Sequence, residues 1–412
     1  MQSLSHSDVV ILFTSISIML LASRMFAELG RKFKLPVVMG EMIMGIILGP
    51  TLIGKLFPGF FEQFFPVSGN VAVSMNAITQ ISVVMLLFVA GMEVQLPVVL
   101  KQGRLALYTS ITSMVIPFTI GFWLAWFKPT LFGLSTEPSI IFSLFMGTAM
   151  AITALPVIAR ILMDMNIYKT RVGMLIMAAA MFDDLVGWLI FSVVLAMMQK
   201  QGVGADIWLT LAYIISFGLL MLTFGRKLLN KALPFIQTKL SWPGGVLAFA
   251  LGLCFLCAAF TEAIGIHAIL GSFIMGIALG DSVHLNERAR EIIHQFVTNI
   301  FAPLFFVSIG LHVNFIENFN LQLVGLVFVI ACFGKIIGAG LGSYMGGLDF
   351  KSSLAVGFGM NARGAMEIVL GTLAYKAGII QEELYVALLI MALVTSISSG
   401  PLMKWALRIK EG

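Results

Sequence analysis

Charged residues are scarce in this chain. Asp, Glu, Lys and Arg make up 11% of its 412 residues and 59% are hydrophobic, whereas a soluble domain carries roughly 25% charged residues. The mean hydropathy of +1.01 agrees with that imbalance. This composition excludes a soluble domain. A membrane-spanning helix takes roughly 20 residues, so a chain of this length is predicted to be an all-α polytopic membrane protein embedded in a lipid bilayer.

Cysteine is equally scarce, with three residues, Cys254, Cys257 and Cys332, all within apolar runs. The first two have CxxC spacing, but no second pair or histidine cluster accompanies them, so we interpret them as small apolar side chains. A cleavable signal is not evident either, because the first apolar run, residues 9–27, is a full span long. The net charge of +5 follows from the excess of Lys and Arg in cytoplasmic loops, and predicts no nucleic-acid partner.

Apolar runs between polar breaks predict thirteen spans joined by short loops. Their approximate limits are 8–29, 36–54, 76–97, 104–127, 138–163, 171–198, 207–225, 243–260, 263–280, 291–312, 322–346, 352–375 and 383–407. With the N-terminus outside and the C-terminus inside, 19 of the 25 Lys and Arg fall in inside loops and four in outside loops, as the positive-inside rule expects. The short loops predict no soluble nucleotide-binding or regulatory domain.

Lys335 and Arg363 belong to no loop, because both lie in the middle of a span. The stretch AMFDDLVGW adds Asp183 and Asp184 to the buried charges, and Glu367 follows Arg363 by four residues. Ionisable residues inside a membrane are costly and mark functional sites by default. A lysine beside one aspartate would hold it as a carboxylate and leave the other for a cation or a proton, which is the chemistry of ion exchange.

Two smaller features of these charges have competing explanations. Arg363 and Glu367 lie on one face of a helix, so an internal salt bridge is favoured over direct cation binding. Glu41, in LPVVMGEMIMGIILGP, is either a gating acid or a helix-packing carboxylate, and the residues favour neither.

Two spans carry helix-weakening centres. In MGTAMAITALPVIARIL, Pro156 follows Thr153 and disturbs the carbonyl of Ile152, four residues before it. In VGFGMNARGAMEIVLG, glycines surround Asn361. Transporters build ion sites from such discontinuous helices at the interface of inverted repeats. Spans four to six and eleven to thirteen would form such an inverted pair, each with a broken helix at its centre.

At these residues the chain resembles the second family of monovalent cation/proton antiporters, which includes NapA-type sodium/proton exchangers and Kef-type potassium/proton systems. The similar segments run nearly from end to end. They are LPVVMGEMIMGIILGP, LLFVAGMEV, ITALPVIARIL, the FDD segment, TEAIGIHAILGSFIMGIALG, FAPLFFVSIGLHVN, FGKIIGAG and NARGAMEIVLG.

The resemblance implies an NhaA/NapA-like antiporter fold that works as a homodimer, with a core that moves as an elevator. Dimerisation parts would be residues 1–103 and 243–321, core ion-transport parts 104–198 and 322–412, and the linker span 199–242. Asp184 would be the main site for cation and proton, with Asp183 beside it as a cation ligand that pairs with Lys335. Thr153 and nearby carbonyls would complete the shell, supported by Pro156, Asn361, Arg363 and Glu367.

The Asp-Asp pair with an intramembrane lysine is found in the sodium exchangers that resemble NapA, so sodium or lithium is favoured over potassium. Relatives with this pattern are associated with electrogenic exchange of two protons per cation, which we hold as a hypothesis. The alternative is a Kef-like potassium/proton antiporter, whose regulatory domain a separate subunit could supply. We expect no resident cofactor, and a prokaryotic cytoplasmic membrane as the location.

Other classes fit less well. An intramembrane aspartyl protease needs aspartates on two helices, and Asp281 in ALGD lies at the end of a span, so we do not expect an enzyme. A channel would show a repeated filter-like segment, which is missing here. A sodium-coupled solute symporter shares the broken-helix logic and remains a weaker alternative.

Overall fold

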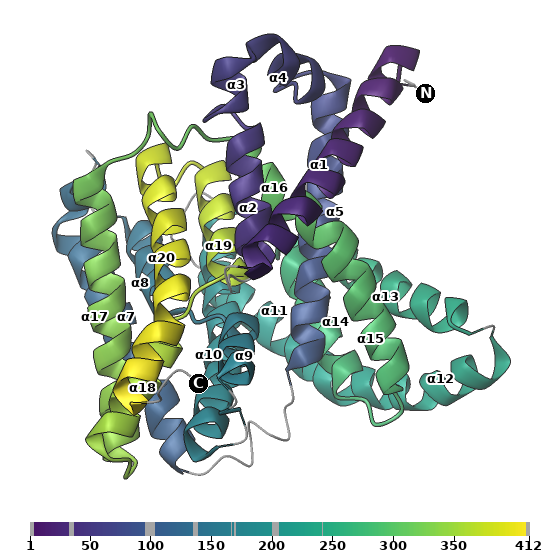
Figure 1. Cartoon of the computed structure of the whole chain (residues 1–412). Helices are drawn as coiled ribbons and strands as arrows, with labels where there is room; N and C mark the ends of the chain where they lie inside the picture. Colours follow the sequence, from purple (N-terminus) through teal and green to yellow (C-terminus); the bar gives the residue numbers. More distant parts are fainter. Residues whose placement is uncertain are drawn as a thin grey trace. The chain divides into compact units, whose positions relative to one another are not determined.

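The computed structural model describes residues 4–32, 37–94, 104–134, 139–165, 167–168, 170–199, 206–240 and 242–408, and these contain helices and no strand (Figure 1). Within these residues, ten helices are long and apolar enough to cross a membrane. Two shorter apolar helices accompany them, α8 (Ile140–Ala151) and α14 (Ala268–Gly280). The all-helical membrane class predicted from composition is therefore confirmed. Each of the thirteen predicted ranges falls on a helix or a pair of helices, while the number of crossings stays a prediction.

The seventh predicted span was placed at residues 207–225, but its helix continues well beyond that limit. Helix α11 (Asp206–Leu220) passes through a π-helical segment (Met221–Gly225) into α12 (Arg226–Lys239) without a break. The basic residues after 225 end the apolar run, and for that reason the sequence predicted a boundary there. Lys and Arg are good helix formers, so the helix continues after the hydrophobic run has ended.

The chain divides into two compact units, each built from two stretches of sequence. Unit 1 comprises Met1–Gln95 and Ala205–Glu317, and unit 2 comprises Leu96–Gly204 and Asn318–Gly412. Unit 1 therefore includes the helix predicted as a linker. The dimerisation and transport roles assigned to these parts stay predictions.

In its described residues, unit 1 contains α11 and α12 together with nine further α-helices. These are α1 (His6–Lys32), α2 (Val37–Leu48), α3 (Ile53–Leu56), α4 (Pro58–Phe64), α5 (Asn70–Glu93), α13 (Gly244–Ala263), α14, α15 (Glu287–Phe296) and α16 (Ala302–Leu311). Helices α5 and α14 pack so closely that a Cβ on Gly276 would lie 2.1 Å from the Phe88 carbonyl oxygen. The Arg290 guanidinium donates to the carbonyls of Met92 and Gly280, at 3.0 and 2.6 Å, and so caps both helices at one end.

Glu41 lies on α2 and is 3% exposed. Its Oε2 atom has no hydrogen-bond partner within the part of the chain that the structure describes. A neighbouring glycine on the same helix, Gly45, lies so close to α16 that a Cβ would come 2.4 Å from the Val307 carbonyl oxygen. Glu41 is therefore a buried carboxyl in a tightly packed helix pair.

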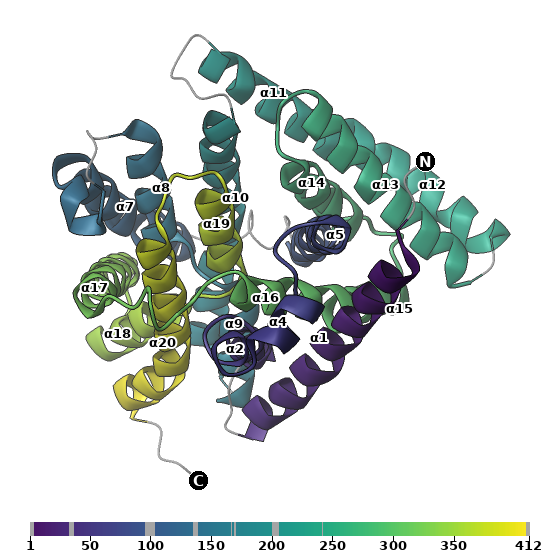
Figure 2. The same cartoon turned by 90° about the horizontal axis from the view of Figure 1, so that it is seen from above.

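Unit 2 contains α7 (Arg104–Phe127), α8, α9 (Leu155–Asp164), α10 (Arg171–Gln199), α17 (Leu321–Met345), α18 (Phe350–Met360), α19 (Ala365–Lys376) and α20 (Glu382–Leu407). Figure 2 shows α7 and α17 side by side. Glycine recurs at every fourth position towards the end of α17, at Gly334, Gly338 and Gly342, and again at Gly346 directly after the helix. A Cβ at Gly338 would lie 2.5 Å from the Thr112 carbonyl oxygen. This glycine stripe brings α17, and with it Lys335, against α7.

Candidate functional site

Both predicted helix breaks are confirmed. Helix α8 ends at Ala151 and α9 begins at Leu155, with residues 152–154 non-helical between them. Pro156 lies in the first turn of α9, where its missing N–H costs nothing, and its side chain lies outside the described part. Helix α18 ends at Met360 and α19 begins at Ala365. The two breaks touch, because the Ala154 amide donates to the Ala362 carbonyl at 3.0 Å.

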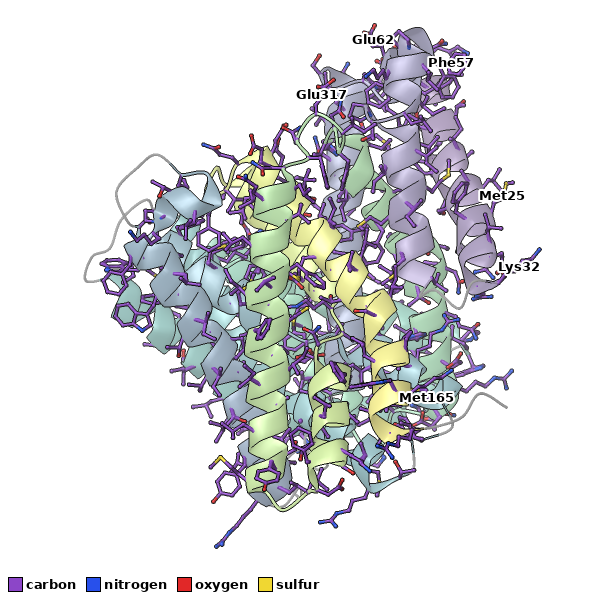
Figure 3. All side chains as sticks on the ribbon, turned by 60° about the vertical axis from the view of Figure 1, so that its left-hand side comes forward. Met25, Lys32, Phe57, Glu62, Met165 and Glu317 are labelled. Atoms are coloured by element: carbon purple, nitrogen blue, oxygen red, sulfur yellow. The ribbon has the colours of Figure 1, made fainter. Side chains whose placement is uncertain are left out.

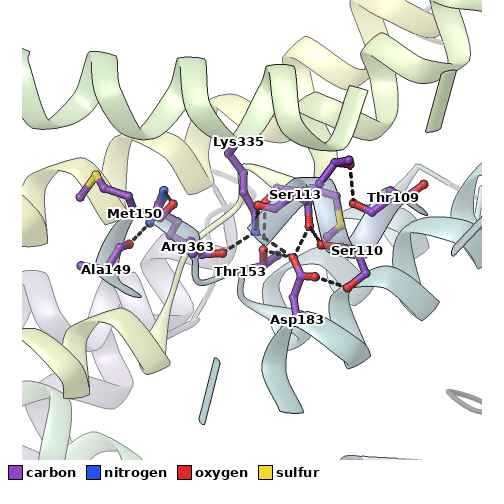
Figure 4. A network of polar contacts seen from close by, with 12 residues as sticks. Thr109, Ser110, Ser113, Ala149, Met150, Thr153, Asp183, Lys335 and Arg363 are labelled. Atoms are coloured by element: carbon purple, nitrogen blue, oxygen red, sulfur yellow. Dashed lines mark hydrogen bonds and ion pairs between the residues drawn. The ribbon is translucent and has the colours of Figure 1, made fainter. Parts of the chain in front are cut away.

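The predicted pairing of Asp183 with Lys335 is present in unit 2 (Figure 4). Lys335 Nζ lies 2.8 Å from Asp183 Oδ2, and both side chains are 0% exposed. Lys335 also donates to the carbonyls of Ser113 at 3.1 Å and Ala151 at 2.5 Å. An ammonium has three N–H donors, so these three acceptors account for all of them, and they come from α7, α8 and α10.

Asp183 accepts further hydrogen bonds that the sequence did not predict. Ser110 Oγ donates to Oδ1 and Ser113 Oγ to Oδ2, each at 2.6 Å, and Thr153 Oγ1 lies 3.2 Å from Oδ2. Bonds of 2.5–2.7 Å are typical of a hydroxyl that donates to a carboxylate. Both serines lie on α7 and are buried. Their spacing of three residues on one helix face was the only signal in the sequence, and serines in apolar helices usually bond to their own backbone.

Arg363 completes a row of cations along the end of α8. Its guanidinium donates to the carbonyls of Ala149 at 2.5 Å and Met150 at 2.7 Å. It also forms the predicted salt bridge with Glu367, at 3.1 Å. The last carbonyls of a helix lack partners within it and carry a partial negative charge. Arg363 and Lys335 together bind three consecutive carbonyls there, so these carbonyls are engaged by protein cations.

The remaining predicted residues lie around this network. Asp184 follows Asp183 on α10 and is half-buried, and adjacent helical positions differ by about 100° in direction. Asn361 Nδ2 lies 3.2 Å from Cys332 Sγ at the break of the twelfth span. Thr153 Oγ1 also lies 3.3 Å from the Met360 carbonyl, so it joins the two breaks. The roles of all these residues in ion binding stay predictions.

This arrangement combines a tightly held carboxylate, a half-buried carboxylate and two fixed cations at the meeting point of two broken helices. Hard alkali cations prefer oxygen ligands such as carboxylates and carbonyls, and a proton competes for the same carboxylate oxygen. The site therefore suits reversible binding of a small cation or a proton better than covalent catalysis.

Comparison with known proteins agrees with this chemistry. Residues 16–409 match the family described as sodium/hydrogen exchanger, transmembrane. The chain is 30% identical over 401 residues to the Na⁺/H⁺ antiporter NhaS4 of Synechocystis, covering 96% of this chain and 97% of that protein. It is 29% identical to cation/H⁺ antiporter 17 of Arabidopsis thaliana over 95% of its own length, and spans 48% of that longer protein.

Among solved structures, the sodium proton antiporter MjNhaP1 of Methanocaldococcus jannaschii has the same fold, with a TM-score of 0.65 at 18% identity. The match covers 98% of this chain and 99% of that one. The resemblance inferred from the sequence motifs, to the cation/proton antiporters, is confirmed. The chain belongs to the sodium/hydrogen exchanger family.

Proposed function

We propose that the protein is a secondary active antiporter that exchanges a monovalent cation, sodium or lithium in preference to potassium, for protons. Cation and proton would compete for Asp184. The observation that carries this proposal is the buried Asp183–Lys335 ion pair, at 2.8 Å, directly beside Asp184 in the chain. Lys335 compensates the Asp183 carboxylate, and the half-buried Asp184 follows it on the same helix.

The charges of the network favour a monovalent ion. Three carboxylates, of Asp183, Asp184 and Glu367, stand with two cations, Lys335 and Arg363, in the same unit. The formal charges of these five groups sum to −1. One bound alkali cation or one proton would bring it to zero, which lowers the cost of holding it in a low-dielectric interior.

The choice of sodium rests on the Asp-Asp pair with Lys335 and on the relatives. NhaS4 is named as a Na⁺/H⁺ antiporter, and GerN of Bacillus cereus, 26% identical, as a Na⁺/H⁺-K⁺ antiporter. The K⁺/H⁺ antiporter 1 of Saccharomyces cerevisiae is 28% identical over 379 residues and makes potassium the alternative.

We further propose that unit 2 moves as an elevator and that the protein works as a homodimer in a prokaryotic cytoplasmic membrane, with thirteen spans, the N-terminus outside and the C-terminus inside. Every hydrogen bond of the Asp183–Lys335 network described above lies within unit 2, which supports transport of the site with its unit. Helix α1 presents large exposed apolar side chains such as Met25, 72% exposed (Figure 3). Such a face suits lipid or a second copy of the chain.

Proteoliposomes test the function directly. A pH-sensitive dye inside the vesicles should report proton movement when sodium or lithium is added outside, with a weaker response to potassium and with no organic solute present. Asp184→Asn should abolish that response. Asp349→Asn is the matched control, because Asp349 is exposed, and it caps α18, a place that Asn fills equally well. Wild-type turnover in Asp184→Asn would overturn the assignment of Asp184.

The same vesicles separate the alternatives. A response to potassium that exceeds the response to sodium would favour the potassium antiporter, and a requirement for an organic solute would favour a symporter. Exchange of two protons per cation would generate a membrane potential, and clamping the potential with valinomycin and potassium would then accelerate the sodium response; one-for-one exchange would not respond to the clamp.

A further inference from the structure

The Ser396 side chain on α20 forms hydrogen bonds outside its own helix, at the break between α18 and α19. Its Oγ accepts from the Arg363 amide at 3.1 Å and donates to the Arg363 carbonyl. Ser396 is 3% exposed and Arg363 is 0% exposed. A serine hydroxyl offers one donor and two acceptor lone pairs, so this one side chain serves both backbone groups of Arg363.

The neighbouring buried hydroxyls of α20 bond within their own helix. Thr395 Oγ1 donates to the Met391 carbonyl at 2.9 Å, and Ser399 Oγ donates to the Thr395 carbonyl at 2.8 Å. Such bonds are usual for a hydroxyl in an apolar helix. Ser396 instead supplies hydrogen bonds to a backbone segment that lies between two helices. A buried backbone group without a partner costs about as much free energy as a lost hydrogen bond, so this contact stabilises the break.

We propose that Ser396 is a positioning residue, which fixes the backbone of Arg363 and through it the crossing of the two broken helices. This inference rests on the proposed function, because it assigns the crossing to the ion site. The Arg363 guanidinium binds the last carbonyls of α8 (Figure 4). The preceding carbonyl, of Ala362, accepts the Ala154 amide of the other break at 3.0 Å. Both contacts depend on where the backbone of residues 362 and 363 lies.

Thr153 connects the second break to the predicted ion site. Its Oγ1 lies 3.3 Å from the Met360 carbonyl, at the end of α18, and 3.2 Å from Asp183 Oδ2. A second break that adopts other conformations would therefore displace oxygen atoms beside Asp183. When only part of the protein has the binding-competent conformation, the apparent affinity falls by that fraction. Saturating sodium would restore the competent conformation, so the affinity should change more than the maximal rate.

The decisive variant is Ser396→Ala, which removes both hydrogen bonds to Arg363. We expect the apparent KM for sodium in proteoliposomes to rise by about tenfold, the factor that corresponds to the loss of one or two buried hydrogen bonds. The maximal rate should stay within about twofold of the wild type. Ser396→Thr keeps the hydroxyl and should restore the wild-type KM.

Two matched controls come from the same helix. Ser399→Ala is the same substitution at a buried serine whose hydroxyl bonds within α20, and Thr395→Val removes such a hydroxyl with little change of shape. Neither should change the sodium KM. A general packing defect would lower the maximal rate and leave KM unchanged. Ser396→Cys keeps a side chain of similar size with a weaker donor, and it should raise KM by a smaller factor, so the test survives if the alanine variant fails to fold.

Hydrogen exchange followed by mass spectrometry tests the positioning role without transport. A peptide that contains residues 361–364 should exchange about tenfold faster in Ser396→Ala than in the wild type, and at the wild-type rate in Ser399→Ala. Wild-type exchange and wild-type KM in both Ser396 variants, or an equal KM increase in Ser399→Ala, would overturn the proposal. Faster hydrogen exchange with an unchanged KM would refute the link between the crossing and the ion site. Failure of the wild type to exchange ions would refute the proposed function and leave the hydrogen-exchange result standing.

Discussion

Replacing Lys335 by methionine removes the ammonium group but keeps a chain of similar length. Three acceptors lose the hydrogen bond from the ammonium at once: Asp183 Oδ2, the Ser113 carbonyl and the Ala151 carbonyl. Asp183 Oδ2 keeps the bond from Ser113 Oγ but loses its counter-charge. Removing one partner of a buried ion pair costs about 3–5 kcal/mol, because an uncompensated charge stays in the interior. Both side chains of this pair are 0% exposed, so solvent does not screen the loss. We expect Lys335→Met to lower the free energy of unfolding by about 3–5 kcal/mol.

The measurement is an unfolding titration with sodium dodecyl sulfate in mixed micelles, followed by tryptophan fluorescence, on four proteins. These are the wild type, Lys335→Met, Asp183→Asn and the double variant. Lys335→Met leaves the buried Asp183 charge without its counter-charge, and Asp183→Asn removes that charge. The double variant should therefore be more stable than the sum of the two single effects predicts. Lys376→Met, at an exposed lysine of unit 2, should change stability by about 0.5 kcal/mol or less. A loss below about 1 kcal/mol in Lys335→Met, or strictly additive effects, would refute the ion-pair reasoning.

Two further predictions concern helix packing. Gly338→Ala places a Cβ about 2.5 Å from the Thr112 carbonyl oxygen. It should lower the free energy of unfolding by about 1–3 kcal/mol and reduce exchange by displacing Lys335. The control is Gly325→Ala on the same helix, where nothing lies within 4 Å of the added atom, and it should be tolerated in both unfolding and transport assays. In unit 1, Arg290→Ala removes hydrogen bonds to the ends of two helices and should lower the free energy of unfolding by about 1–3 kcal/mol. Arg288 is exposed, and Arg288→Ala should leave that free energy unchanged. Equal effects of the two substitutions would contradict the capping role of Arg290.

The sequence predicted those residues of the site whose burial without a partner would cost the most free energy, namely the charged side chains. A charge in an apolar span must find a counter-charge, so the residues alone predicted that Lys335 would hold one of the two aspartates and that Arg363 would pair with Glu367. The choice of Asp183 as the partner of Lys335 came from the resemblance to the antiporter family. The breaks at Pro156 and around Asn361 were predictable because proline and glycine act locally. The seventh helix was predicted too short because hydropathy marks the end of a bilayer crossing and carries no signal for the end of a helix.

The contacts that the sequence did not predict are hydroxyl bonds to a carboxylate, or bonds between a cation and the backbone, across helices. Burying a serine such as Ser110 in an apolar helix costs little free energy, because its hydroxyl can bond to a carbonyl of its own helix. The presence of such a serine in the sequence therefore does not imply a distant partner. The carbonyls of Ala149 and Met150 carry no residue-specific signal at all, since every helix end exposes them. Only the crossing of the two broken helices brings them to Arg363.

These cation–carbonyl bonds bear on how the site could move. Lys335 and Arg363 donate three hydrogen bonds to the end of α8, and bonds that involve a charged group contribute about 1.5–3 kcal/mol each. Opening the site by pulling α8 away from them would therefore cost about 5–9 kcal/mol, or roughly three to six powers of ten in population. Movement of unit 2 as one body would leave every one of these bonds intact. The network that makes the buried charges tolerable therefore favours the proposed elevator movement over opening of the candidate site within unit 2.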